Sequence, residues 1–480
     1  MIVCQCGTFT GQQGPTAGRC CGLSETGIYF FGDQTMKRPN LVLYSVVLGL
    51  LLSTIPANAE APKDFSPPFD QQQLPRAMHS PMSELPHITV GMDSGDIVGT
   101  DNQALQAAVD YIAGLGGGVV NVRPGRYDMY DSLHLRSNVV VRAAKGRTIL
   151  KKADGAVSPL ALDGDSGQEQ ITIEKTDGFA VGCGVAIWDD NAGGFHTTVA
   201  RITGRRGNTF SISRPLMADC MVNRNARAAT VFPVVSGYDL VNAAVEGITV
   251  EGNRDANIYL NGCRGAGIFL YRGFATTIKG CTVRNYNGDG ISFQQSNDVE
   301  VVDCVSENNA SLGIHPGSGS QRPLVRDCLA RGNGTDGLFL CWRVRHGLFE
   351  NNLLEKNGRF GISIGHKDSD NVLRKNTVRM NDSNGVFFRN ESLGMGAHRN
   401  RLENNIVENN GRSDRAAGIR IRGYTNDLIF KSNIIRDTRT GDDATQTIGV
   451  LIEENVGRVS LEGNEIEAAE RIIDKRNQKQ

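Results

Sequence analysis

Five segments of the chain repeat one short pattern: GISF (290–293), GIHP (313–316), GLFL (337–340), GISI (361–364) and GVFF (385–388). In each segment a glycine precedes a branched aliphatic residue, and successive glycines are 23, 24, 24 and 24 residues apart. A unit this short cannot bury an apolar face alone, so it must stack on its neighbours. The stride therefore predicts a solenoid in which each rung takes 23 or 24 residues.

A second column of residues keeps the same stride and is expected to face the interior of the solenoid. Stacked asparagines bond to one another through their amides, and stacked buried thiols behave as small apolar side chains. The pattern favours an inward ladder over disulfides or a metal site, since no C-x-x-C or zinc-type Cys/His spacing occurs after the leader. The column consists of Cys281, Cys304, Cys328, Asn352 and Asn376, followed at longer steps by Asn405, Asn433 and Asn464.

The chain divides into segments of different character. The apolar run 41–52, which follows Lys37 and Arg38 and precedes Ala57-Asn58-Ala59, indicates a secretory signal. A membrane anchor is the alternative, but the run is shorter than the ~20 residues that a spanning helix needs. We expect an exported protein, periplasmic or extracellular. The expected segments are a start-site artefact over 1–35, a signal peptide over 36–59, a linker over 60–90, an N-terminal cap and first rungs over 91–163, a small antiparallel β insertion over 164–233, further rungs over 234–470 and a polar tail over 471–480.

Charge and composition narrow the classes of partner. The chain has 51 basic and 52 acidic residues and a formal net charge of −1 at pH 7. No global field directs it to nucleic acid or to an anionic membrane, so neither nucleic acid nor stable membrane insertion is expected. An aromatic content of 6 % argues mildly against a dedicated sugar-stacking module.

The segment GTDNQALQAAVDYIAGLGGGVVNVRPGRYDMYDSLHLRSNVVV (99–141) predicts an amphipathic helix followed by a strand. Leu105, Val109 and Ile112 would form its buried face, and Asp101 is placed to cap the helix. The segment resembles the N-terminal cap of the pectate-lyase-like superfamily, which includes pectate lyases, polygalacturonases, rhamnogalacturonases, alginate epimerases and phage tailspikes. The resemblance implies an all-β fold, a right-handed parallel β-helix with an N-terminal capping helix and, here, a small antiparallel β insertion. It also implies a carbohydrate-active protein.

Polar and aromatic side chains follow the repeated strands at fixed distances, so neighbouring rungs bring them side by side, ~4.8 Å apart. His315 lies on a strand and is expected to point outward, whereas the turns after the strands supply the other members of the set. The alternative is a solvated wall whose charges pair along a column. We expect catalytic roles for His315, Arg343, His366 and Lys367, and substrate-binding roles for Arg322, Trp342, Arg389 and Glu391.

This set fits the eliminative cleavage or the epimerisation of a uronate. Both reactions need the sugar carboxylate neutralised and a base that removes the proton at carbon five. Arg343 and Arg389 are the candidates for neutralising the carboxylate. His315, His366 or Lys367 would be the base, with a pKa lowered by the neighbouring cations.

Hydrolysis is not excluded by the sequence. It needs two carboxylates ~5 to 9.5 Å apart, for which Asp368, Asp370 and Glu391 are candidates. Asp368 and Asp370 are also the candidates for a Ca2+ ion, although hard cations prefer six to eight oxygens. The chain departs from the polygalacturonase pattern, because it has Gly365-His366-Lys367 where that family carries Gly-His-Gly. It also lacks the clustered strand acids of calcium-dependent pectate lyases.

The leading hypothesis is an exported enzyme that cuts or epimerises an acidic polysaccharide, with a lyase favoured over a hydrolase. A protein that binds glycan without cleaving it and a structural or oligomeric scaffold are the other two classes. The expected partner is a polysaccharide, and association into a homo-oligomer stays open.

Overall fold

The computed structural model describes residues 84–412 and 415–476. The predicted start-site artefact (1–35), the signal peptide (36–59) and most of the expected linker lie outside the described residues. Across the described part, no helix combines the length and the apolar character needed to cross a bilayer.

The N-terminal helix α1 (Asn102–Gly114) forms where the sequence predicts it. The side chain of Asp101 accepts a hydrogen bond from the Gln103 backbone N–H at 2.9 Å, which confirms the expected N-cap. Leu105, Val109 and Ile112 are buried and join the core of the first rungs. The helix therefore covers apolar surface that the first rung would otherwise expose.

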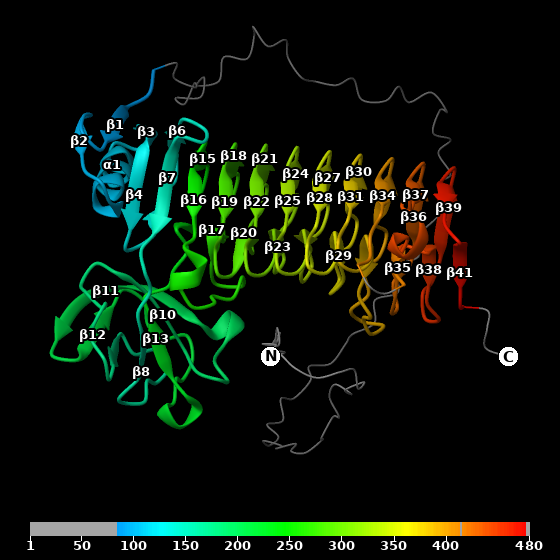
Figure 1. The fold of residues 1–480 in the computed structure, drawn as a ribbon. Coiled ribbons are helices and arrows are strands. Elements are labelled where there is room, and N and C mark those ends of the chain that lie inside the picture. The colour runs from blue at the N-terminus through cyan, green and yellow to red at the C-terminus, as the bar shows by residue number, and fades with distance from the viewer. Residues whose placement is uncertain (1–83, 413–414, 477–480) are drawn as a thin grey trace, which may run out of the picture. The chain divides into compact units, whose positions relative to one another are not determined.

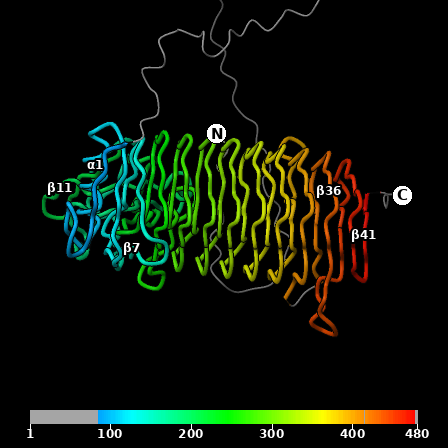
Figure 2. The backbone as a smooth tube through the Cα atoms, turned by 90° about the horizontal axis from the view of Figure 1, so that it is seen from above, coloured from blue at the N-terminus to red at the C-terminus, as the bar shows by residue number. Residues whose placement is uncertain are grey.

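Most of the remaining chain forms three parallel sheets, here called A, B and C (Figure 1). Figure 2 shows the successive turns of the chain lying beside one another in sequence order. Sheet A contains β2 (Ile97–Val98), β1 (His87–Gly91), β3 (Gly118–Val122), β6 (Val139–Ala143), β15 (Ala244–Glu246), β18 (Thr277–Lys279), β21 (Glu300–Val302), β24 (Leu324–Arg326), β27 (Leu348–Glu350), β30 (Val372–Arg374), β33 (Arg401–Glu403), β36 (Leu428–Lys431) and β39 (Val459–Glu462).

Sheets B and C complete each rung. Sheet B contains β4 (Gly125–Met129), β7 (Thr148–Lys152), β16 (Thr249–Glu251), β19 (Thr282–Arg284), β22 (Val305–Glu307), β25 (Leu329–Arg331), β28 (Leu353–Glu355), β31 (Thr377–Arg379), β34 (Ile406–Glu408), β37 (Ile434–Arg436) and β40 (Glu465–Glu467). Sheet C contains β5 (Leu133–His134), β14 (Val235–Tyr238), β17 (Ala266–Tyr271), β20 (Asp289–Gln294), β23 (Ile314–Gly317), β26 (Leu338–Phe339), β29 (Ile362–Ile364), β32 (Val386–Phe388), β35 (Ala417–Ile421), β38 (Ile448–Ile452) and β41 (Glu470–Asp474). Short 3-10 helices, η4 (Arg254–Ala256) and η5 (Gly441–Asp443), lie in connecting loops.

The rungs reach slightly beyond the segments expected from the sequence. Strand β1 begins within the segment expected as a linker, and β41 takes in the start of the segment expected as a polar tail. Both strands pair in parallel with a neighbouring rung.

The repeated glycines allow neighbouring rungs to approach closely. A Cβ added to Gly313 would lie 2.6 Å from the carbonyl oxygen of Gly337, and one added to Gly337 would lie 2.9 Å from that of Gly361. None of these three glycines has a positive φ, so the requirement is space and not backbone conformation. The aliphatic residue that follows each glycine points into the core, as Ile314 and Leu338 do in register.

The predicted ladder is present in the interior. Asn352 donates to Asn376, which donates to Asn405, and the chain of amides continues through Asn433 to Asn464, with side-chain distances of 2.9 to 3.0 Å. Above it, Cys281, Cys304 and Cys328 are buried thiols in the same column. The steps along the ladder change from 24 to 29 residues at Asn376 without breaking it.

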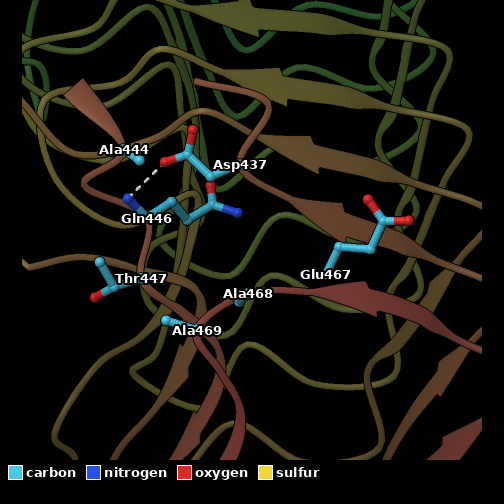
Figure 3. A pocket seen from close by; sticks show the side chains of 7 residues that line it. All are labelled: Asp437, Ala444, Gln446, Thr447, Glu467, Ala468 and Ala469. Carbon is cyan, nitrogen blue, oxygen red and sulfur yellow. Dashed lines mark hydrogen bonds between the residues drawn. The ribbon is translucent and has the colours of Figure 1, made fainter. Parts of the chain in front are cut away.

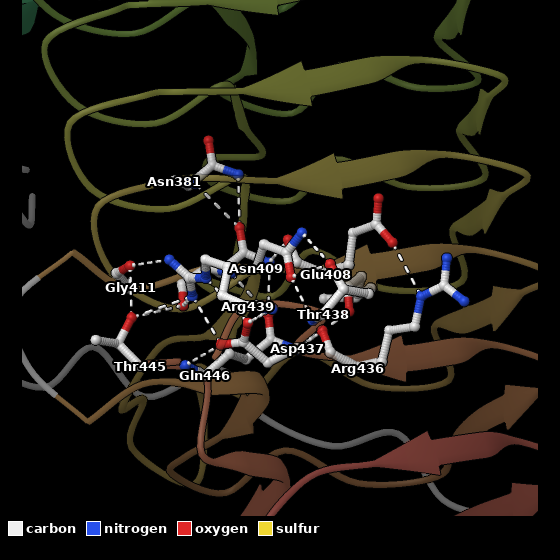
Figure 4. A network of polar contacts seen from close by, with 12 residues as sticks. Asn381, Glu408, Asn409, Gly411, Arg436, Asp437, Thr438, Arg439, Thr445 and Gln446 are labelled. Atoms are coloured by element: carbon white, nitrogen blue, oxygen red, sulfur yellow. Dashed lines mark hydrogen bonds and ion pairs between the residues drawn. The ribbon is translucent and has the colours of Figure 1, made fainter. Parts of the chain in front are cut away.

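A second inward ladder was missed by the sequence analysis. It runs through Asn309, Asn333, Asn357, Asn381 and Asn410 and ends at Gln446. Gln446 accepts from Asn410, while a network of Arg439, Asp437 and Thr445 holds the loop that carries Gln446 (Figure 4). The network therefore closes the second ladder at its C-terminal end.

A six-stranded antiparallel sheet interrupts the rungs after β7, which confirms the predicted kind of insertion. Buried residues such as Ile173, Ile187 and Phe210 give it a core of its own. In Figure 1 it appears in green, below the first rungs. Its strands are β8 (Val157–Pro159), β13 (Arg227–Ala229), β10 (Gly184–Trp188), β11 (Thr198–Arg206), β12 (Thr209–Ile212) and β9 (Gln170–Thr172), with the 3-10 helices η2 (Gly194–His196) and η3 (Val222–Arg224) between them.

Candidate functional site

Sheet C and the turns that follow its strands carry most of the predicted site residues. His315 on β23 is 3 % exposed and pairs with Asp289 on β20, which is 1 % exposed. The Nδ1 of His315 lies 2.7 Å from a carboxylate oxygen of Asp289, and a carboxylate can only accept, so Nδ1 donates. Nε2 faces the Gln294 side-chain amide at 3.5 Å. Both of these neighbours lie on β20, so the preceding rung holds the His315 ring.

Arg389 occupies the centre of a second group of contacts. Its guanidinium donates to the Ser363 hydroxyl at 2.9 Å and to the Leu340 carbonyl at 2.7 Å, and it lies over the Phe339 ring. It also pairs with Asp368 at 3.1 Å. Protein acceptors already occupy both terminal nitrogens of Arg389. Its contacts therefore stabilise the turn, and we assign it a structural role and not a substrate-binding one.

Asp368 is fully buried beside Arg389. Burial raises the pKa of the Asp368 carboxyl to about 7, while Arg389 and the backbone N–H groups of Val344 and Gly365 act in the opposite direction. The carboxyl therefore holds two turns of the chain together from inside.

The turns after β26 and β29 bring Trp342 and His366 together. The two rings stack with centroids 5.1 Å apart and an interplanar angle of 22°. The Nε2 of His366 lies 3.3 Å from a carboxylate oxygen of Glu391, and the side chain of His366 is 25 % exposed. Arg343 lies over the Trp342 ring, with its guanidinium carbon 5.6 Å from the ring centroid. Five of the predicted residues thus share one region, since Lys367 follows His366 directly.

The same two turns have an unusual backbone. Trp342 and Arg343 have φ values of 61° and 68°, and His366 and Lys367 have φ values of 45° and 66°. Among the described residues, these are the two places where consecutive non-glycine residues have positive φ. One rung earlier the equivalent positions are Ser318 and Gly319, as the pairing of Gly317 with Cys341 establishes.

The left-handed conformation is disfavoured for side chains with a Cβ, by roughly 1–2 kcal/mol. Glycine at position 319 avoids this cost, whereas Arg343 and Lys367 do not. Strained backbone of this kind concentrates at functional sites. Within the part of the chain that the structure describes, neither of these two cations has a carboxylate partner within salt-bridge distance.

The structure separates Arg322 from this region. Arg322 makes a bidentate ion pair with Asp298, which lies 24 residues earlier. The Nε and Nη2 atoms of Arg322 are each 2.7 Å from a carboxylate oxygen of Asp298. Asp370, one of the carboxylates considered for hydrolysis and for Ca2+, makes a similar pair with Arg399. Asp368 and Asp370 therefore face different partners, and no cluster of three or more potential metal-ligating side chains occurs among the described residues.

The expectation of a cation beside each histidine is wrong for His315, whose ring pairs with Asp289. His366 pairs with Glu391, and Lys367 follows it directly in the same turn. The sequence analysis also missed the role of Asp289. Asp289 and His315 are 26 residues apart, whereas the stride between their two rungs is 23, so the stride does not align them.

A pocket of about 300 Å3 lies near the C-terminal rungs and is lined by residues that include Asp437, Gln446 and Glu467 (Figure 3). Asp437 pairs with Arg439 and accepts from the Gln446 backbone. These contacts belong to the network that closes the second ladder, so we assign this pocket to the structure of the C-terminal end.

Comparisons with known proteins bear on the fold. The family described as "Right handed beta helix region" matches residues 266–435, and "Periplasmic copper-binding protein (NosD)" matches residues 168–325. Mannuronan C5-epimerase AlgE5 of Azotobacter vinelandii is 22 % identical over 306 residues, which is 62 % of this chain. The chain spans about a fifth (22 %) of the length of that curated relative.

A solved structure gives the same picture of the fold. The A-module of mannuronan C-5 epimerase AlgE6 from Azotobacter vinelandii has a TM-score of 0.50 and 16 % identity, over 78 % of this chain and 91 % of that chain. The Dettilon tailspike protein has a TM-score of 0.48 and 12 % identity, over 77 % of this chain and 57 % of that chain. The resemblance drawn from the N-terminal segment is confirmed at the level of the fold, and the chain is a right-handed parallel β-helix protein.

Proposed function

We propose that the protein is a polysaccharide-active enzyme that removes the proton at C5 of a uronate unit, as a C5-epimerase or a lyase. The observation that carries the proposal is the pair of cations Arg343 and Lys367. They occupy equivalent left-handed positions on adjacent rungs without a carboxylate partner in the described part of the chain. The name of the relative AlgE5, a mannuronan C5-epimerase, supports the same class of substrate.

In the proposed reaction Arg343 and Lys367 bind the uronate carboxylate. Their charge stabilises the negative charge that develops when the C5 proton leaves, because the electron pair of the C5–H bond is delocalised into the carboxylate group. The two side chains start from positions about one strand spacing (~4.8 Å) apart, which suits two-sided binding of one carboxylate.

His366 is the residue that we propose as the base. Its side chain is 25 % exposed, whereas His315 is 3 % exposed, so His366 is the histidine that a sugar can reach. With Nε2 donating to Glu391, the lone pair is on Nδ1, which lies 3.9 Å from the Cys341 thiol and would take the proton. Glu391 then stabilises the imidazolium, and Trp342 fixes the plane of the ring. His315 would act as a positioning residue through its contact with Phe339.

The fate of the intermediate separates the two reactions. In a lyase, the bond between C4 and its glycosidic oxygen breaks, that oxygen takes a proton, and a C4–C5 double bond forms. In an epimerase, a proton returns to the opposite face of C5 and no bond of the chain is broken.

The test is a screen of the purified protein against mannuronan and other polyuronates. Inversion at C5 is followed by proton NMR, unsaturated ends by ultraviolet absorbance, and new reducing ends by a chemical assay. We expect inversion or unsaturated ends, and a loss of about a hundredfold or more in His366→Gln, as is typical when a general base is removed. Reducing ends without unsaturation would indicate hydrolysis, and binding without any product would indicate a glycan-binding protein.

We also propose that the protein acts outside the cytoplasm. The signal-like segment 36–59 and the match to a family described as periplasmic support this location. Fractionation of cells that express the full chain should recover the protein in the periplasm or the medium, and recovery in the cytoplasm alone would contradict the proposal.

A further inference from the structure

A second pocket, of about 280 Å3, lies between the antiparallel insertion and the first rungs. Its walls come from β5 and β14 on sheet C and from the strands β11 and β12 of the insertion with the residues that follow them. The volume is just below the range of about 300 to 1,000 Å3 for small-molecule sites, and it suits a single sugar ring.

One carboxylate of the pocket is fully compensated. Asp131 is 1 % exposed and accepts from both His134 and Arg201. The other ring nitrogen of His134 bonds the Ser236 hydroxyl at 2.9 Å. Asp131, His134 and Arg201 therefore form a fixed wall with no excess of negative charge.

Arg214 supplies the uncompensated charge. Its guanidinium carbon lies over the Tyr238 ring, 3.6 Å from the centroid, and in the described part of the chain Arg214 has no carboxylate within salt-bridge distance. Arg136, at the rim, pairs with Asp110. A pocket with one free guanidinium and the hydroxyls of Thr203 and Ser213 presents donors to a single anion.

The pocket and the candidate active site share one face of sheet C. Tyr238 pairs in register with Tyr271, Tyr271 with Gln294, Gln294 with Gly317 and Gly317 with Cys341. Cys341 immediately precedes Trp342. The column therefore runs from the pocket to the active-site turns over four strand spacings, about 19 Å at ~4.8 Å each.

We propose that this pocket is a distal subsite that binds the carboxylate of another uronate unit of the same polysaccharide, with Arg214 as the residue that recognises it. The proposal rests on the proposed function, since it assigns the pocket to the same substrate. A polysaccharide bound at both the pocket and the candidate active site would lie along sheet C. Long substrates would therefore gain a contact that short ones cannot reach.

The experiment compares Arg214→Ala with Arg205→Ala on the polyuronate that the wild type converts. Arg205 is a matched control, because it is also an arginine of the insertion that lies over an aromatic ring, that of Phe210, but it does not line the pocket. Each protein is assayed with oligosaccharides shorter than the span of about 19 Å and with long chains. Thermal unfolding of both variants checks that the insertion remains folded.

We expect Arg214→Ala to raise KM for long chains about tenfold, since hydrogen bonds to charged groups have about this effect. Its kcat, and its KM for short oligosaccharides, should match the wild type, and Arg205→Ala should match the wild type throughout. Arg214→Lys, which keeps the charge, should restore most of the affinity.

Two results would overturn the subsite. One is an unchanged KM of Arg214→Ala on long chains, and the other is an equal rise on short and long chains, which would indicate a general disturbance. With either result, the proposed function still stands if the wild type converts a polyuronate. A wild type that converts no polyuronate refutes the proposed function and the subsite together.

Discussion

The outer surface of sheet B and the turns after sheet C differ in how their cationic side chains are paired. On sheet B, arginines pair with glutamates of the neighbouring rung at 2.7 to 3.0 Å, and the pairs are Arg284 with Glu251, Arg331 with Glu307, Arg379 with Glu355 and Arg436 with Glu408. After sheet C, Arg343 and Lys367 have no such partner among the described residues. Sheet B shows charges that pair along a column, which is the arrangement that the alternative in the sequence analysis predicts for the turns after sheet C. In those turns Arg343 and Lys367 depart from it, and their charge is left for a ligand.

The largest expected effect comes from removing the unpaired charges. We expect the double variant Arg343→Ala and Lys367→Ala to lower kcat/KM on a polyuronate about a thousandfold, because two charged hydrogen-bonding groups are lost. The matched control is Arg331→Ala with Arg379→Ala, which removes two paired arginines from sheet B. Equal losses in the two double variants would remove the functional distinction between the surfaces.

The interior ladder should be more important for stability than the paired outer wall. Asn357 donates to Ala330 and Asn381 and accepts from Asn333, all in the buried interior. We expect Asn357→Ala to lower the free energy of unfolding by about 3 kcal/mol, because buried partners are left unsatisfied. Arg331→Ala should cost less than about 1 kcal/mol, as is typical of exposed ion pairs. Denaturant unfolding of both variants measures the difference, and similar losses would contradict it.

Two carboxylates near the turns should respond differently to pH. The Asp368 pKa is raised to about 7 by burial, so the folded protein keeps this proton after the unfolded chain has lost it. The stability of the wild type relative to Asp368→Asn should therefore fall as the pH rises from about 5 to about 7, by at most about 1.4 kcal/mol per pH unit.

Asp370→Asn is the control for this titration. The bond to Arg399 holds the pKa of Asp370 below its usual value, so this carboxylate is ionised in both states over the same range. The stability difference between wild type and Asp370→Asn should be constant there. Unfolding midpoints measured across the range would refute the assignment of Asp368 if its variant also gave a constant difference.

The smallest expected effect concerns the backbone of the unpaired turns. Because Arg343 has a φ of 68°, Arg343→Gly should raise the free energy of unfolding by about 1 kcal/mol while lowering activity. Arg331→Gly, within a strand of sheet B, should have the opposite effect on stability. A destabilised Arg343→Gly protein would show that the turn does not carry the inferred strain.

Much of the fold follows from arithmetic on the sequence. The spacing of Gly313, Gly337 and Gly361 predicts the rungs, and the Cys/Asn column predicts the first ladder. The second ladder was equally visible, since Asn309, Asn333, Asn357 and Asn381 are each 24 residues apart, but it was overlooked.

The site was less predictable for a physical reason. The stride aligns equivalent positions of neighbouring rungs, so it could bring Trp342 beside His366 and Arg343 beside Lys367. Contacts between different columns, such as Asp368 with Arg389, depend on the lengths and rotamers of the side chains. The spacing of residues along the sequence does not predict these contacts between columns. It also does not predict the left-handed backbone conformation at Arg343.

The change of step within the ladders has a consequence for how such a protein can diversify. Asn371 bonds Asn400, Asn376 bonds Asn405 and Asn381 bonds Asn410, all across 29 residues, yet the amide contacts are the same as those across 24. The additional residues are therefore absorbed between Arg389 and Asn400, in the turn that borders the candidate site. Insertions and deletions in this turn leave the rungs in register, so the surface beside the candidate site can change while the fold stays the same.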